Sequence, residues 1–409
     1  MNDMHLAADL SPAVDARVAP RVQAIDLLRG LAVIGMIMVA YAGDWEHRFT
    51  VLTHADWRGF ALADMIFPSF LFCVGAALPF SLGRRAQHSG DSKAALIGRV
   101  LWRSIALILL GIVLNALPAF DWANVRLMGI LQRIGLCYAA VGTVCVLIGH
   151  RSGRGSEGAG GSRFALDPKP LIAMAVLLLV GYGALLLGWE APGCGAGCFD
   201  SAHSLPTVID RAVFGIAHLW LYGTTNGVVT FDPEGLVSTL GALFNVVLGV
   251  LATLTLQRRT MRSALVALAA SGVLFIVLGL AIDGYVPVVK KIWTPTFALM
   301  SGGFSVLAFV ALALRAPSPD ARWTTPILVY GSNATAAFVG ITLLDTLMQL
   351  PLLRTAAGAT QSLHDGAAAW LGSLISEPRI ASAAYSAVLL LVLGIGLWQL
   401  YQRRIFLKI

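Results

Sequence analysis

Long apolar stretches separated by short polar segments dominate the chain. A helix that crosses a bilayer needs roughly 20 mostly apolar residues, and the chain has ten windows of that kind. They cover residues 25–43, 60–83, 100–118, 129–149, 170–189, 236–256, 263–283, 294–314, 325–349 and 379–402. The pattern therefore predicts an all-α, polytopic membrane protein with about ten transmembrane helices.

Composition excludes the other broad classes of protein. Hydrophobic residues make up 57% of the chain and charged residues 12%, whereas charged residues are roughly 25% of an ordinary soluble domain. A soluble globule of 409 residues has too little interior to hide so much apolar surface, and a disordered chain carries far less of it. Membrane lipid is therefore a predicted partner.

Basic residues are distributed unevenly between the two sides of the predicted bundle. The formal net charge is +7. With the N-terminus placed in the cytoplasm, 19 of the 29 Lys and Arg residues fall in cytoplasmic segments and 9 in outer segments, while Arg29 lies within the first span. Because Lys and Arg collect in cytoplasmic loops, this bias predicts that both termini are cytoplasmic, in a membrane such as the bacterial inner membrane. It also explains the net basicity without a nucleic-acid partner.

The connections divide the chain into two groups of spans. Residues 1–20 are predicted to form a disordered cytoplasmic tail that lacks the features of a signal peptide. Residues 21–150 hold the first four spans and the loop that carries His54. The Gly- and Ser-rich residues 151–169 form a flexible cytoplasmic linker, and residues 170–409 hold the other six spans.

Two outer loops, 190–235 and 350–378, are long enough for structure of their own. In the first, the weakly amphipathic stretch 207–222 is expected to lie on the membrane surface or to dip into it. Cys194 and Cys198 also fall in this loop, and they are expected to form a disulfide if that side is an oxidising compartment. A metal site needs more ligands than this loop offers, so no metal is expected.

Polar side chains gather at the outer ends of the spans. They are His54, Asp64, Asn124, Arg126, Asp232, Glu234, Lys290 and Lys291, from five segments. Each also has an ordinary interpretation, because carboxylates near a helix start cap free N–H groups and lysines extend to the interface. Trp293, next to the lysines, is typical of the aromatic belt at a membrane surface. Eight such groups at one level nevertheless favour a functional site over scattered anchors.

His54 is the candidate for proton transfer. An imidazole titrates near neutrality and accepts a proton from an amine or hydroxyl nucleophile. Ionisable groups within spans also mark functional sites by default. Here Asp26 and Arg29 share a face of the first span, and Arg133 lies near the start of the fourth. Motifs of P-loop and dinucleotide-binding proteins, zinc proteases and serine hydrolases do not occur in a usable context.

Seven phrases, taken in order, resemble one family. They read Asp26-Leu-Leu-Arg29-Gly30, His54-Ala-Asp-Trp57-Arg-Gly59, Ala63-Asp64-Met-Ile-Phe67-Pro68, Asn124-Val-Arg126-Leu-Met-Gly129-Ile-Leu-Gln132-Arg133, Asp232-Pro-Glu-Gly235, Lys291-Ile-Trp293-Thr and Gly331-Ser-Asn333-Ala. Together they resemble the heparan-α-glucosaminide N-acetyltransferase family over most of the chain. The chain looks like a bacterial homologue without the large N-terminal lumenal region of the lysosomal enzyme. It departs from the family at Ala40 and at Arg58, where the family has Asn.

The resemblance implies a membrane-embedded acetyltransferase that moves an acetyl group from cytosolic acetyl-CoA to a glucosamine-type amine on the outer side. His54 matches the catalytic histidine and would act directly as a base or through an acetyl-histidine intermediate. Asp64 would orient the imidazole, and Asn333 or a backbone N–H group would stabilise the oxyanion. The cations expected to meet CoA phosphates are Arg29, Arg126, Arg133 and Lys291. The residues expected to bind the acceptor are Asp232, Glu234, Trp57 and Asn124. A homodimer is expected at the level of the family.

Two other functions fit the same features. The first is a transporter for an amino sugar or a related solute, in which the polar groups form a transport site without a reactive centre. The second is an acyltransferase that acts on a hydroxyl of an envelope glycan or a lipid. The order of the seven phrases favours the N-acetyltransferase over both.

Overall fold

Nearly all of the regular structure is helical. The computed structural model describes residues 19–88, 91–152, 163–315, 322–354 and 358–407. Within these ranges, nine helices are long and apolar enough to cross a membrane, and a bent pair makes a tenth span. The nine are α1 Ala19–Ala40, α2 Ile66–His88, α3 Lys93–Asn115, α4 Ile130–Ile148, α5 Pro168–Gly188, α7 Thr239–Arg258, α8 Met261–Ile282, α9 Pro295–Leu314 and α13 Pro378–Gln402. The predicted all-α, polytopic fold is confirmed.

The ninth predicted span, 325–349, is not one continuous helix. It consists of α10 Thr325–Ser332 and α11 Ala334–Met348, which meet at an angle of 86°. Asn333 stands at the break with φ −123° and ψ 43°, outside the helical region. Its Nδ2 donates to Ile405 O at 3.1 Å, and its Oδ1 accepts from Leu407 N at 3.0 Å. The C-terminal segment therefore folds back onto the break and satisfies the amide.

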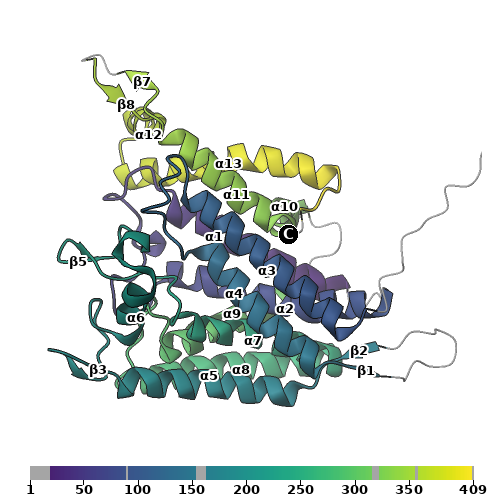
Figure 1. The fold of residues 1–409 in the computed structure, drawn as a ribbon. Coiled ribbons are helices and arrows are strands. Elements are labelled where there is room, and N and C mark those ends of the chain that lie inside the picture. The colour runs from purple at the N-terminus through teal and green to yellow at the C-terminus, as the bar shows by residue number, and fades with distance from the viewer. Residues whose placement is uncertain (1–18, 89–90, 153–162, 316–321, 355–357, 408–409) are drawn as a thin grey trace, which may run out of the picture.

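Short elements occupy the connections, most of them at one end of the bundle. They are α6 Leu205–Phe214, α12 Leu363–Leu374, the hairpins β3 Glu190–Ala191 with β4 Gly195–Ala196, β5 Thr224–Thr225 with β6 Val228–Val229 and β7 Leu353–Arg354 with β8 Thr360–Gln361, and the 3₁₀ turns η1 Thr50–Leu52, η2 Leu62–Met65, η3 Ile216–His218 and η4 Arg322–Thr324. Figure 1 places β3, β5, β7–β8 and α6 at one end of the bundle, with β1 His150–Ser152 and β2 Arg163–Ala165 at the other.

Two predicted segments lie wholly or partly outside the described residues. Of the predicted tail 1–20, residues 1–18 are not described, and Ala19 already begins α1. Of the predicted linker 151–169, residues 153–162 are not described. The residues that flank this gap pair as the antiparallel strands β1 and β2.

The beginning of α1 and the end of α13 lie on the same side of the bundle. The C-terminal end of α1 meets the start of α13, where Asp44 N donates to Ser382 Oγ at 3.0 Å. Because α1 and α13 run side by side in opposite directions, the end of α13 lies toward the beginning of α1. This arrangement agrees with an even number of spans. The cytoplasmic location of the termini stays a prediction.

Helix α7 is the most deeply buried span, and it crosses α2 at very short range. A Cβ added at Gly75 of α2 would overlap the carbonyl oxygen of Val246, and one added at Gly249 of α7 would overlap that of Phe72. Small residues let two backbones approach in this way, which is how helices associate in membranes. Spans α4 and α9 pack against both helices of the α2–α7 pair, whereas α10, α11 and α13 pack against α1.

We expect Gly75→Ala to destabilise the protein by about 1–3 kcal/mol, because the added methyl group forces α2 and α7 apart. Gly83→Ala is the matched control, since a Cβ at that position of the same helix meets no atom within 4 Å. Alanine favours a helix over glycine by up to about 1 kcal/mol, so the control should be neutral or slightly stabilising. Thermal unfolding in detergent measures both variants, and equal midpoints would contradict the close crossing.

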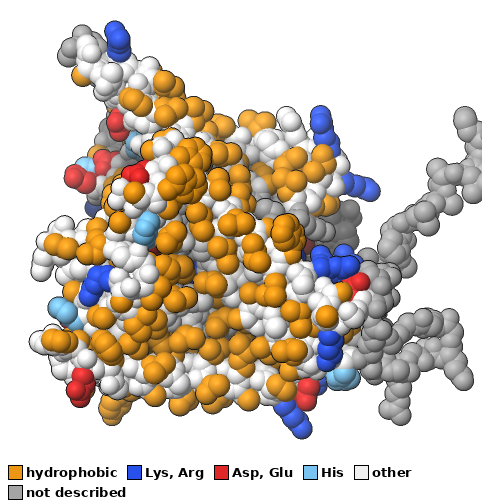
Figure 2. Space-filling model, viewed as in Figure 1, with side chains coloured by type: hydrophobic (Ala, Val, Ile, Leu, Met, Phe, Trp, Pro, Cys, Tyr) orange, Lys and Arg blue, Asp and Glu red, His pale blue; other side chains and the backbone are white. Residues whose placement is uncertain are grey.

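The outside of the bundle is apolar. Figure 2 shows hydrophobic side chains over the middle of the molecule and charged side chains toward its two ends. Large apolar residues on three helices are well exposed, for example Leu177 on α5 at 71%, Val266 on α8 at 65% and Leu391 on α13 at 70%. A surface of this extent is suited to lipid rather than water, as the sequence predicts.

Candidate active site

His54 and Asp64 are held together just beyond the C-terminal end of α1. His54 Nδ1 lies 2.8 Å from Oδ1 of Asp64, which is fully buried. The other carboxylate oxygen accepts from the backbone N–H groups of Ala61 at 2.9 Å and Ala55 at 3.3 Å. A carboxylate fixed in this way accepts a hydrogen bond from the protonated Nδ1. The lone pair of the neutral ring then lies on Nε2. The predicted orientation of the imidazole by Asp64 is therefore geometrically available.

Lys290 completes a three-residue cluster with His54 and Asp64. Its Nζ lies 2.8 Å from Nδ1 and 3.1 Å from Nε2 of His54, and 3.3 Å from Oδ1 of Asp64. The loop 283–294 that carries Lys290 is tied to the His54 loop, because Gly59 N donates to Val288 O at 2.9 Å. Sequence reasoning placed Lys290 near the site but selected its neighbour Lys291 as the binding residue.

Trp293 fixes the Lys290 loop from the inside. The prediction that it belongs to an interfacial belt is wrong, since the side chain is 1% exposed. Its Nε1 donates to Asn245 Oδ1 at 3.0 Å, and its ring makes edge contacts with Phe67 and Phe297. A backbone hydrogen bond of 2.9 Å from Trp293 N to Lys290 O closes the turn. The buried indole therefore sets where the lysine points.

The electrostatic surroundings keep His54 neutral. Burial lowers the pKa of the His54 imidazolium. The hydrogen bond that the ring donates to Asp64 opposes this, the Lys290 ammonium lowers the pKa further, and Glu234 raises it. Burial also lowers the pKa of Lys290, against the attraction of Asp64 and Glu234. The net direction for His54 is downward, which suits a group that must accept a proton at neutral pH.

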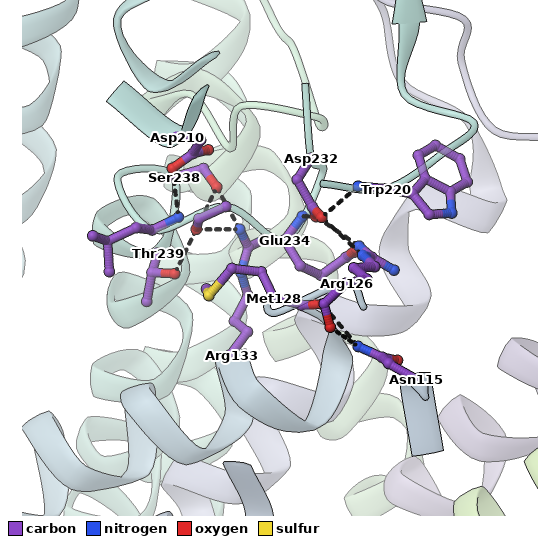
Figure 3. A network of polar contacts seen from close by, with 12 residues as sticks. Asn115, Arg126, Met128, Arg133, Asp210, Trp220, Asp232, Glu234, Ser238 and Thr239 are labelled. Carbon is purple, nitrogen blue, oxygen red and sulfur yellow. Dashed lines mark hydrogen bonds and ion pairs between the residues drawn. The ribbon is translucent and has the colours of Figure 1, made fainter. Parts of the chain in front are cut away.

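A second network joins Arg126 to two carboxylates (Figure 3). Arg126 donates from Nε to Asp232 Oδ2 at 2.8 Å and from Nη2 to Asp232 Oδ1 at 2.6 Å. Nη2 also donates to Glu234 Oε2 at 2.5 Å. Asp232 is buried and accepts two backbone N–H groups as well, from Trp220 at 3.1 Å and Glu234 at 2.9 Å. The pair is therefore fully engaged within the protein.

This network changes what Arg126, Asp232 and Asn124 are placed to do. Sequence reasoning proposed a CoA phosphate for Arg126 and a sugar for Asp232, but each already has its partner in the other. Asn124 is exposed, and its Nδ2 donates to Asp121 Oδ2 at 2.7 Å. Glu234 alone connects the network to the reactive cluster, through its electrostatic effect on His54 and Lys290.

Arg133 is the one predicted cation that is completely buried. It lies in the first turn of α4, with its guanidinium carbon 4.9 Å from the ring centre of Trp293. Its Nη2 donates to Gly235 O at 3.1 Å and to Ser238 Oγ. Its Nε and Nη1 have no hydrogen-bond partner among the described residues. Buried donors without partners are costly, and these two N–H donors are able to donate hydrogen bonds to an oxygen atom of a ligand.

Lys291 and Trp57 lie on the other side of the Lys290 loop. Lys291 Nζ is 5.2 Å from the ring centre of Phe231 and 5.9 Å from that of Trp57. Trp57 makes an edge contact with Phe231 at 5.1 Å, and its Nε1 donates to Phe199 O at 2.7 Å. The lysine rests on aromatic faces, and no carboxylate within 4 Å is paired with it in the described part of the chain.

Arg29 and Asn333 lie in a different part of the bundle from His54. Arg29 is ion-paired with Asp26 at 2.6 Å and donates to Gly331 O at 2.5 Å. Arg29 stands eleven residues before the end of α1, about 16 Å along a helix, and Asn333 lies two residues after Gly331. Asn333 therefore cannot serve as the oxyanion donor beside His54 that sequence reasoning proposed, since the folded-back C-terminal segment binds its amide instead.

Cys194 and Cys198 form the expected disulfide. Asp200 lies nearby and forms the only cysteine-containing group with metal-ligand spacing among the described residues. Its carboxylate holds His203 at 3.0 Å. The disulfide uses both thiols, so the chemistry of this donor set does not favour a metal.

The helices and the His54 cluster define a polytopic membrane protein with an acid–base site at one end of its bundle. Residues 21–150, which include His54 and Asp64, match the family model described as heparan-alpha-glucosaminide N-acetyltransferase, catalytic. The human protein named heparan-alpha-glucosaminide N-acetyltransferase is 28% identical over 377 residues, covering 82% of this chain and 55% of that protein. The mouse protein of the same name is 29% identical, covering 83% and 56%.

These comparisons confirm the resemblance predicted from the sequence. The chain spans about half the length of the curated relatives it matches. The matched family region ends before Lys290, so the loop that completes the His54 cluster lies outside it.

Proposed function

We propose that the protein is a membrane-embedded N-acetyltransferase that moves an acetyl group from acetyl-CoA to the amine of a glucosamine-type sugar. The observation that carries the proposal is the hydrogen-bonded pair of His54 and Asp64, which leaves Nε2 as a base in the region that matches the family's catalytic model. The names of the relatives support the choice of an amine acceptor. Cytoplasmic acetyl-CoA and an acceptor on the opposite side are what the resemblance to the family implies.

His54 Nε2 is the reacting atom of the proposed mechanism. It removes a proton from the acceptor nitrogen as that nitrogen attacks the acetyl carbon. Asp64 keeps the proton on Nδ1 and stabilises the imidazolium that forms. The alternative route through an acetyl-histidine uses the same atom, so both routes require the same tautomer of the ring.

The cations of the site divide into two groups. Arg29 and Arg126 are occupied by carboxylates. Within the described residues, Nε and Nη1 of Arg133 have no hydrogen-bond partner, and Lys291 lies over aromatic rings without a carboxylate within 4 Å. We therefore assign Arg133 and Lys291 to oxygen atoms of acetyl-CoA. Glu234 is assigned to the acceptor, because its carboxylate lies near His54 and an amino sugar is cationic before it is deprotonated.

The pH dependence of kcat is expected to reflect the lowered pKa of His54. Burial lowers this pKa and Lys290 lowers it further, so the neutral ring predominates at pH 6.5, about the ordinary pKa of histidine. The midpoint of the acidic limb, where Nε2 becomes protonated, should therefore lie below pH 6.5. Rates at saturating acetyl-CoA and acceptor measure this limb, and an inflection above pH 6.5 would contradict the assignment.

A panel of acceptors tests the proposed function. Purified protein in detergent would be given labelled acetyl-CoA with glucosamine, with an N-blocked sugar that offers only hydroxyls, or with a lipid acceptor. Label on glucosamine alone is the expected result. Label on a hydroxyl acceptor would favour the O-acyltransferase, and glucosamine uptake by proteoliposomes without acetyl transfer would favour the transporter.

A further inference from the structure

The position of Lys290 beside the His54 ring is not explained by orientation of the imidazole. Asp64 accepts the hydrogen bond from Nδ1 that orients the ring, at 2.8 Å. Lys290 Nζ nevertheless lies within 3.1 Å of both ring nitrogens, although its side chain is only 15% exposed. Holding an ammonium group out of water beside a base is costly, and the ion pair of Lys290 with Asp64 at 3.3 Å does not require a contact with Nε2.

We propose that Lys290 is a second catalytic residue, whose ammonium group donates a hydrogen bond to the acetyl carbonyl oxygen as negative charge develops there. The proposal rests on the proposed function, and it gives to Lys290 the electrophilic role that sequence reasoning gave to Asn333. In the resting site the ammonium lies beside the ring, with Nζ 3.1 Å from Nε2 and 2.8 Å from Nδ1 of His54. The acceptor nitrogen takes that place when it binds, and the ammonium turns to the carbonyl oxygen.

The geometry suits this exchange. In the tetrahedral intermediate, the oxyanion and the attacking nitrogen are bonded to the same carbon. A donor about 3 Å from the base that holds the nitrogen's proton is therefore also within reach of the oxyanion. Lys290 Nζ contacts Asp64 Oδ1 at 3.3 Å and the two ring nitrogens at 2.8 and 3.1 Å. An N–H bond that turns away from the ring when the acceptor binds can reach the substrate, and the buried surroundings strengthen its interaction with a developing charge.

The step balances without another reactant. The acceptor nitrogen forms a bond to the acetyl carbon while the carbonyl π pair moves to oxygen, and His54 Nε2 takes the proton from nitrogen. When the intermediate collapses, that pair re-forms the carbonyl and the C–S bond breaks. The proton on His54 then passes to the departing CoA thiolate. Lys290 keeps its three protons throughout.

The charged groups around the cluster come from three segments. Asp64 and Glu234 face His54 and Lys290, and Lys291 faces Lys290 from the same loop. Removing the Lys290 charge leaves the two carboxylates to act on His54 without opposition. The pKa of the imidazolium should then rise, and the acidic limb of kcat should move to higher pH. A residue that only packs in the loop would not move this limb, and the loss of kcat on the plateau separates a donor to the oxyanion from a charge that acts only on the pKa of His54.

The test compares acetyl transfer to glucosamine by wild type, Lys290→Met, Lys290→Arg and His54→Ala. Removal of one oxyanion donor typically lowers kcat by about 100- to 1000-fold, and we expect a loss of that size in Lys290→Met together with the upward shift of the acidic limb. Lys290→Arg keeps the charge, so it should keep the position of the limb and recover part of the rate. Lys169→Met is the matched control, since Lys169 is exposed at the start of α5, and it should behave as wild type.

Unchanged kcat or an unmoved limb in Lys290→Met would overturn the role of Lys290 while His54→Ala still lost activity. If a thermal unfolding curve showed that Lys290→Met is not folded, Lys290→Gln would replace it. Its kcat and the position of its acidic limb would then be compared with those of wild type. Absence of acetyl transfer by wild type would instead overturn the proposed function, so the two failures are distinguishable.

Discussion

Replacement of His54 by alanine is expected to lower kcat for acetyl transfer by about 10²- to 10⁴-fold, the usual contribution of a general base. Nε2 is the atom that removes the acceptor's proton, and alanine offers no substitute. The side chain of His54 is 39% exposed, so its removal should leave the thermal stability nearly unchanged. Steady-state rates with labelled acetyl-CoA, together with a thermal unfolding curve, measure both effects.

The same loop provides a matched control for this variant. His47 Nδ1 also lies 2.8 Å from a carboxylate, that of Asp44, but both side chains are about half exposed and belong to an i, i+3 pair. His47→Ala should retain full activity. Equal losses in the two variants would show that removal of any histidine from this loop disturbs the protein, and would contradict a specific role for His54.

Replacement of Arg126 by alanine is expected to cost about 3–5 kcal/mol of folding free energy, because it leaves a buried carboxylate without its partner. Asp232 is 2% exposed and faces Arg126 through two hydrogen bonds. The Glu234 carboxylate loses its partner as well. Thermal unfolding in detergent measures the change, with the loss of the monodisperse size-exclusion peak as the signal.

Arg99→Ala is the control for the Arg126 variant. Arg99 is ion-paired with Asp91, and its side chain is 46% exposed. An exposed pair of this kind contributes only about 0–1 kcal/mol, so its loss should barely shift the midpoint. If Arg126→Ala were equally mild, Arg126 would be free for a ligand, as the sequence alone suggested.

The spans were predictable because each one repeats the same requirement, a stretch of apolar residues long enough for the bilayer. The break at Asn333 was not, because an amide within an apolar run has no local signal that distinguishes a helix interior from a kink. What decides it is the return of Ile405 and Leu407 to the same place, more than seventy residues later. The hydrophobic periodicity of a segment does not predict contacts with residues so far away in the sequence.

The sequence predicted at which end of the bundle the polar groups gather, but not which of these groups pair with one another. Polar groups at the outer ends of five segments indicated convergence, and His54 and Asp64 do meet. The partner of Arg126 is 106 residues away in Asp232, so the sequence could not separate a phosphate-binding arginine from a structural one. The choice between Lys290 and Lys291 depends on a turn fixed by the burial of Trp293, which sequence reasoning assigned to the membrane surface.

Acetyl transfer across a sealed membrane is the most direct measurement of the proposed activity. Proteoliposomes would hold glucosamine inside, with labelled acetyl-CoA supplied only outside. Formation of labelled N-acetylglucosamine in the lumen is the predicted result, and His54→Ala proteoliposomes should form almost none. Label that appears only when both substrates share one compartment would contradict transfer through the bundle, and no labelled product under either arrangement would contradict the acetyltransferase itself.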